Sequence, residues 1–238
     1  MGYALPPAFL AAVFTQQMPY SANDPAYDSA ALENYRGRDK HMTEQNREER
    51  PFARDAASNG GYVYTTNRPW SARVAIERQT QAVLDLAEFS RKRVIDIGCG
   101  DGATTIDLYD RTLPESIEAI DPAAAAIAVA QSRREDRPVH FSVGSAYCLP
   151  WPDLHFDVAH LRGVLHHMND PQQAVREAAR VARQVVILEP NGWNPALKLI
   201  EKLSPYHRAH GERSFLPETL RRWLREAGLR VGAAGYSA

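Results

Sequence analysis

The sequence has few cysteines, no excess of positive charge and no long apolar run. Its 238 residues include only Cys99 and Cys148, too few for a disulfide framework, so we expect two reduced thiols. Lys and Arg number 28 against 29 Asp and Glu. A chain with this balance lacks the basic surface that binds nucleic acid through phosphates, and we expect no such partner. Because no run reaches the length of a transmembrane helix, we also expect no membrane partner and a cytoplasmic location.

The first quarter of the chain shows no sustained helical or strand period. An apolar patch at 8–14 is not preceded by basic residues, so it does not resemble a signal peptide. We therefore predict a mobile amino-terminal extension over residues 1–60. The ordered domain is predicted over 61–238, with a small cap around 191–216.

The most informative stretch is VIDIGCGDG at 94–102. Its β-branched start predicts a buried strand, and the residues from Ala103 onward predict a helix. Gly98, Gly100 and Gly102 lie between the two. Glycines at the amino end of a helix let a ligand approach the backbone closely, although a tight turn without any ligand has the same composition.

Strands and helices alternate along the remaining chain, which predicts an α/β fold with a doubly wound, mostly parallel, Rossmann-like sheet and flanking helices. The later strands are predicted at 117–122, 138–144, 155–163, 184–190 and, apparently incomplete, 229–238. The helices are predicted at 71–88, 103–111, 123–130, 171–182, 195–203 and 217–228.

Four motifs in this order resemble those of the class I S-adenosylmethionine (SAM) methyltransferases: VIDIGCGDG, AIDP, GSAYCLP and FDVAHLRGVLHHM. The resemblance implies SAM as cofactor and methyl transfer to an unidentified, small-molecule acceptor. It also implies seven strands, the last two forming an antiparallel hairpin. The sequence predicts no seventh strand, so either the chain is truncated or an amino-terminal segment replaces that edge.

The resemblance also implies a cofactor site. Asp96 suits the ammonium group of SAM, and the amides of the glycine loop suit its carboxylate. Asp121 follows the glycines by roughly 20 residues and suits the ribose hydroxyls, although it could instead cap the next helix. Ser145 stands where the family usually has Asp beside the adenine. The full predicted set is Asp96, Gly98, Cys99, Gly100, Asp121, Pro122, Ser145, Ala146, Leu161 and Arg162.

His167 and His166 follow the fourth motif and are the predicted catalytic residues, as general bases. His167 is preferred as the base, and the alternative is that one histidine packs in the helix start while the other only shapes the pocket. Glu189, Asn191, Tyr206, His207 and His210 could line the substrate pocket. His207 and His210 are spaced like a helical metal pair, but a third ligand at set spacing is absent, so no metal site is predicted and solvated loop residues are the favoured account.

Two other functions stay open at this point. The chain could be a non-catalytic SAM-binding module, that is, a truncated pseudoenzyme. A nicotinamide oxidoreductase is disfavoured because its glycine fingerprint has the third glycine one residue later than this chain has it.

Overall fold

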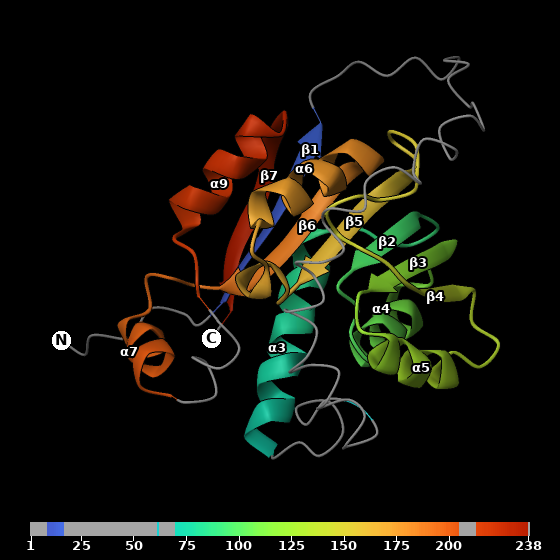
Figure 1. The fold of residues 1–238 in the computed structure, drawn as a ribbon, viewed down its shortest axis with the longest axis horizontal. Coiled ribbons are helices and arrows are strands. Elements are labelled where there is room, and N and C mark those ends of the chain that lie inside the picture. Colours follow the sequence, from blue (N-terminus) through green and yellow to red (C-terminus); the bar gives the residue numbers. More distant parts are fainter. Residues whose placement is uncertain (1–8, 17–60, 62–69, 205–212, 238) are drawn as a thin grey trace.

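The computed structural model describes residues 9–16, 61, 70–204 and 213–237. Seven strands form one sheet in the order β4-β3-β2-β5-β6-β1-β7, with helices on both faces (Figure 1). The strands are β1 (Phe9–Gln16), β2 (Arg93–Ile97), β3 (Ser116–Asp121), β4 (Val139–Val143), β5 (Phe156–Arg162), β6 (Ala182–Pro190) and β7 (Leu229–Ser237). The α-helices are α3 (Trp70–Leu86), α4 (Ala103–Thr112), α5 (Ala124–Arg133), α6 (Pro171–Val181), α7 (Pro195–Leu203) and α9 (Pro217–Glu226).

Strands β2 to β6 are parallel where they pair, which confirms the predicted doubly wound α/β sheet. Helices α4, α5 and α6 connect successive strands along the chain. The central strand β2 is apolar apart from Arg93 and Asp96, and its last four residues are buried. Parallel strands covered on both faces need such continuous apolar runs, and this is why the central sheet was readable from the sequence.

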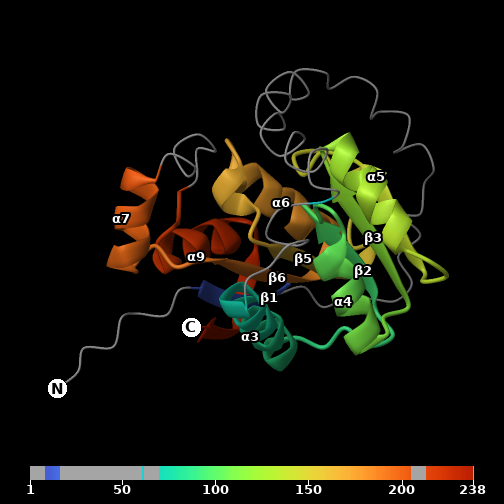
Figure 2. The same ribbon diagram turned by 90° about the horizontal axis from the view of Figure 1, so that it is seen from below.

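Two hydrophobic cores cover the two faces of the sheet. One face packs against α6 and α9, through residues such as Val175 and Leu224. The other packs against α3, α4 and α5, through residues such as Val83, Leu108 and Ile127. Figure 2 shows the sheet between α6 and α9 on one side and α3 and α4 on the other.

Strand β1 corrects the prediction that residues 1–60 form a mobile extension. Phe9–Gln16 lies inside the sheet, antiparallel to both β6 and β7, and takes the position that the missing hairpin strand would fill. Its residues from Leu10 to Phe14 are all buried. A strand with both faces covered has no polar alternation, so the sequence showed only an apolar patch. Residues 17–60 lie outside the described part of the chain.

The starts of α6 and α5 show whether the capping residues suggested by the sequence cap the helices. Asp170 caps α6, because its Oδ1 accepts from the Gln173 amide (3.0 Å) and Pro171 takes the first helical position. The alternative in which Asp121 caps the next helix, α5, is wrong. That helix begins at Ala124 with Ala123 as its N-cap residue, so Asp121 is not a helix cap.

Helix α7 forms the described part of the predicted cap. It follows the carboxyl end of β6 and lies outside the sheet in both views (Figures 1 and 2). None of its residues is buried, and Leu199 is 57% exposed. The predicted pocket residues Tyr206, His207 and His210 lie outside the described residues.

Candidate active site

The strand order has its switch point at the carboxyl ends of β2 and β5, and we refer to this place as the crevice. The chain runs outward from β2 through β3 to β4 and then returns to β5 on the other side of β2. Open α/β sheets bind ligands at such a switch point, beyond the carboxyl ends of the strands. Here the two loops that meet are the glycine loop at 98–102 and the loop at 163–168, which contains a turn of 3₁₀-helix at Leu165–His167.

The glycines are required by backbone conformation and by close packing. Gly98 has a φ of +78°, and a Cβ atom there would lie 2.2 Å from Cγ2 of Val164 in the opposite loop. Gly102 has a φ of +75°, and its Cβ would lie 2.8 Å from atoms of Ala130 and Phe141. The two loops of the crevice therefore touch directly at Gly98.

Most amides of the glycine loop are already used within the protein. Those of Gly98 and Cys99 both donate to the Ile120 carbonyl (2.8 and 3.0 Å), and that of Gly102 donates to the Cys99 carbonyl (3.1 Å). The Gly100 amide donates to Oδ2 of Asp121 (3.0 Å). The loop is thus fixed by hydrogen bonds within the protein, and these four amides donate to protein acceptors.

Asp121 joins the end of β3 to the glycine loop. Besides the bond from Gly100, its Oδ1 accepts from the Ala123 amide (2.9 Å), and the residue is 8% exposed. The carboxylate thus fixes the glycine loop against the end of β3. Pro122 follows it and is half-buried.

Asp96, which was predicted to contact the ammonium group, is hydrogen-bonded within the protein. Its Oδ2 accepts from the Thr105 hydroxyl (2.6 Å), and its Oδ1 lies 2.9 Å from Nδ1 of His160. Asp96 and His160 are each 2% exposed. The carboxylate therefore ties β2 to β5 and α4 inside the protein, which offsets the cost of burying it.

Asp101 covers the amino end of α4. Its Oδ1 accepts from the amide of Ala103, the first residue of the helix (3.3 Å), and its Oδ2 pairs with Arg133 (3.1 Å). The side chain is 2% exposed. A ligand phosphate at this helix end would meet a buried carboxylate instead of open amides.

Cys99 lies at the centre of this acidic loop. Burial raises the pKa of its thiol well above the ordinary value, and the charges of Asp121 and Asp96 act in the same direction. A thiol held protonated in this way is a packing group and a poor nucleophile.

The remaining residues predicted to bind the cofactor differ in burial and in their hydrogen bonds. Ser145 is half-buried and its Oγ accepts from the Tyr147 amide (3.2 Å). Ala146 is buried, and the Leu161 side chain is fully buried in the core. Arg162 donates to the Thr80 hydroxyl (2.8 Å) and the Ile76 carbonyl (3.1 Å), so its guanidinium anchors α3 to β5.

Glu189 is hydrogen-bonded to the loop at 163–168, which lies opposite the glycine loop. This carboxylate at the end of β6 is 0% exposed, and its Oε1 accepts from the amides of Val164 (2.9 Å) and Leu165 (2.8 Å). Its Oε2 lies 2.8 Å from Nδ1 of His166. The sequence placed Glu189 in the pocket lining only. The sequence signal that could have indicated this role was an acidic residue at the end of an otherwise apolar strand.

The two predicted histidines lie together in this loop, and His166 meets the Glu189 carboxylate. The rings of His166 and His167 have centroids 3.8 Å apart and are tilted by 43°. The returning segment after α7 packs on the same loop, because the Arg213 amide donates to the His166 carbonyl (3.3 Å). Arg213 also donates to the Met168 carbonyl (3.1 Å). The segment that returns after α7 is therefore hydrogen-bonded to the loop at 163–168.

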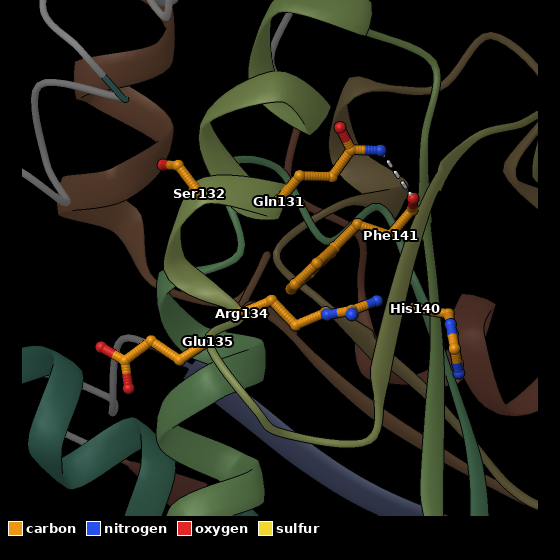
Figure 3. A pocket seen from close by; sticks show the side chains of 6 residues that line it. All are labelled: Gln131, Ser132, Arg134, Glu135, His140 and Phe141. Carbon is orange, nitrogen blue, oxygen red and sulfur yellow. Dashed lines mark hydrogen bonds between the residues drawn. The ribbon is translucent and has the colours of Figure 1, made fainter.

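A separate hollow of about 510 Å³ lies between the end of α5 and strand β4. Figure 3 shows Arg134 extending toward the strand that carries His140 and Phe141. His140 is the second residue of β4, so this hollow is at the amino end of the sheet, opposite the crevice. Its lining is Gln131, Ser132, Arg134, Glu135, His140 and Phe141.

Within the described ranges, no group of three or more His, Cys, Asp and Glu side chains could hold a metal ion. None of the described helices is long and apolar enough to cross a membrane.

Comparisons with known proteins agree with this architecture. Residues 95–188 match a family model described as a methyltransferase domain. An uncharacterized methyltransferase, YcgJ of Bacillus subtilis (strain 168), is 38% identical over 95 residues, which are 39% of this chain and 37% of that protein. The 2-methyl-6-phytyl-1,4-hydroquinone methyltransferase 2 of Oryza sativa subsp. japonica is 34% identical over 96 residues, which are 40% of this chain and 28% of that protein.

Solved structures show the same fold. The structure of YcgJ from Bacillus subtilis has a TM-score of 0.55 at 24% identity and covers 64% of this chain and 68% of that one. The [4+2]-cyclase SpnF has a TM-score of 0.58 at 24% identity and covers 79% of this chain and 70% of that one. The aligned part is well under two thirds of either curated relative. The family match over residues 95–188 and the shared fold therefore make the methyltransferase domain the family that this part of the chain resembles.

Proposed function

We propose that this protein transfers the methyl group of SAM to a small-molecule acceptor. The observation that carries the proposal is the contact between Asp121 and the Gly100 amide at the switch point of the sheet. It places a carboxylate beside a rigid glycine turn, where a ribose with two hydroxyls would bind.

The charge of the glycine loop supports SAM over a phosphate-containing cofactor. The carboxylates of Asp121, Asp96 and Asp101 all act on Cys99 at the centre of the loop. Such a field favours a ligand with a positive sulfonium and an ammonium, and it repels a pyrophosphate. The carboxylate at the start of α4 disfavours a nicotinamide cofactor for the same reason.

Several residues would hold the cofactor. Asp121, followed by Pro122, would accept from the ribose, and the loop of Gly98, Cys99 and Gly100 would lie along the methionine part. The segment of Ser145 and Ala146 would border the adenine. Leu161 would contribute backbone only, because its side chain is buried in the core. Asp96 and Arg162 would support the site through their bonds to α4 and α3.

SAM, when bound, supplies a methyl carbon activated by a positively charged sulfur. The chain contributes positioning, because an in-line displacement needs the acceptor held at one angle and distance. The loop of His166 and His167 faces the glycine loop across the Gly98 contact with Val164. Where the acceptor's nucleophile carries a proton, one of these histidines would accept it.

A SAM-binding module without catalysis is the second candidate. The observation that favours it is Ser145, which stands where the family usually has Asp beside the adenine. The similarity in fold to a [4+2]-cyclase shows only that this fold is not restricted to methyl transfer. Good SAM affinity without turnover on any acceptor would support this candidate.

Calorimetric titration of the full chain with SAM tests the proposal. Asp121→Ala removes charge-assisted hydrogen bonds to the ribose, so binding should weaken by about 1.5–3 kcal/mol, or roughly 10- to 150-fold. Asp110→Ala is the matched control, since Asp110 pairs with Arg137 on the surface of α4. A folded wild-type protein that does not bind SAM, or equal binding by both variants, would refute the proposed site.

A further inference from the structure

The segment that would border the adenine is fastened to helix α6 just beyond the proposed contact. Nε2 of Gln173 donates to the Tyr147 carbonyl (3.2 Å), and Oε2 of Glu177 accepts from the Leu149 amide (2.8 Å). Gln173 and Glu177 are four residues apart and therefore lie on one face of α6, one above the other. The chain is thus held on this helix from Tyr147 onward.

The side chain of Tyr147 reaches from this segment to the end of the loop at 163–168. Its hydroxyl accepts from the backbone amides of Asn169 (3.1 Å) and Asp170 (3.4 Å), which follow the loop and precede α6. Tyr147 is 7% exposed, whereas Asn169 and Asp170 are exposed. A buried hydroxyl therefore joins the segment beside the adenine to the exposed end of the loop that contains the histidines.

The turn that contains Tyr147 begins at the residues proposed to meet the cofactor. Oγ of Ser145 accepts from the Tyr147 amide (3.2 Å), and the Cys148 amide donates to the Ser145 carbonyl (3.4 Å). A ligand that lies on Ser145 and Ala146 restrains this turn and, with it, the position of the tyrosine ring. Restraining one end of such a connection lowers the freedom of the group at the other end.

We propose that Tyr147 is a positioning residue that couples the cofactor site to the acceptor side, so that bound SAM stabilises the loop at 163–168. This inference rests on the proposed methyl transfer and adds an order of binding, with SAM before the acceptor. Opening of the loop end breaks the amide bonds to the Tyr147 hydroxyl, and bound SAM makes this opening rarer. Because coupling between two sites is reciprocal, a bound acceptor raises the affinity for SAM by the same factor.

Hydrogen exchange of single backbone amides, followed by NMR in the ¹⁵N-labelled full chain with and without saturating SAM, tests the coupling. SAM should slow exchange at Asn169 and Asp170 by at least about fivefold, the lower end of the range for coupled sites. The Arg93 amide is the internal control, because it also donates to a side-chain oxygen, that of Asp157 (2.9 Å), but at the amino end of the sheet. Equal slowing at Arg93 would show general stabilisation by a ligand and would overturn the coupling.

Tyr147→Phe separates coupling from a structural role, because it deletes the hydroxyl and keeps the ring in the core. In this variant the Asn169 and Asp170 amides should exchange faster, and SAM should still bind but no longer slow their exchange. Tyr109→Phe is the matched control, since Tyr109 is partly buried on the other face of the sheet, and it should respond to SAM as the wild type does. If Tyr147→Phe speeds exchange equally with and without SAM, the tyrosine is only structural and the proposal is overturned.

The outcomes distinguish this inference from the proposed function. A folded wild-type protein that binds no SAM in calorimetry refutes the proposed function and the coupling with it. A protein that binds SAM without selective slowing at Asn169 and Asp170 refutes the coupling alone.

Discussion

Replacing Phe14 in strand β1 tests whether the amino-terminal strand belongs to the folded core. Phe14 is 2% exposed and pairs with Val185 of β6 and Val231 of β7. Its side chain belongs to the core that includes Leu220 and Leu224 of α9. Phe14→Ala deletes a whole aromatic ring from between the sheet and a helix, and such changes cost about 3–5 kcal/mol of unfolding free energy.

The loss is large enough to measure in two ways. For a protein of this size, each kcal/mol shifts the midpoint temperature by about 2–4 °C, so we expect a decrease of roughly 6–20 °C. Urea unfolding followed by far-UV circular dichroism gives the free energy itself. Leu199→Ala is the control, since Leu199 is an apolar residue that is 57% exposed on α7, and it should change stability by less than about 0.5 kcal/mol. An equally small effect for Phe14→Ala would refute the integration of β1 into the core.

Two further predictions concern the ionisable groups. Because burial and neighbouring carboxylates raise the pKa of the Cys99 thiol, an aromatic disulfide reagent should leave Cys99 of a Cys148→Ser variant unmodified at pH 8 until urea is added; reaction at the rate of an exposed thiol in the native protein would contradict this. Burial also raises the pKa of the Glu118 carboxyl, against the opposite effect of His140, so the folded state disfavours its ionised form and Glu118→Gln should raise the midpoint temperature at pH 7. That gain should vanish below the ordinary pKa of 4.5, where the carboxyl is protonated in both states, and a gain that persists there would show that packing is its cause.

The parts of the fold that were predictable carry their signals locally. The start of α6 was readable from Asp170 and Pro171, and that of α7 from Pro195 at its first position. The glycine loop was readable because its neighbouring strand and helix lie directly beside it in the sequence. Each of these features depends on residues within one or two turns of each other.

The parts that were missed depend on distant partners. Strand β1 is recognisable only beside β6 and β7, because nothing in its own sequence shows that both faces are covered. Asp96 is engaged by His160, which lies 64 residues away, and Arg162 by Thr80, which lies 82 residues away. Residue type indicated that both were polar groups near the crevice, but it could not show that each would be hydrogen-bonded to a residue far away in the sequence.

The position of β1 also sets an order for the folding of this chain. Phe9–Gln16 is synthesised before either of the strands that it pairs with, and its first partner begins only at Ala182. At 5–20 residues per second, the ribosome takes roughly ten to thirty seconds to produce that partner. The apolar segment FLAAVF must therefore wait for the part of the sheet that is made last. Until then its apolar side chains have no strand to pair with, and the sheet closes only when β7 has been made.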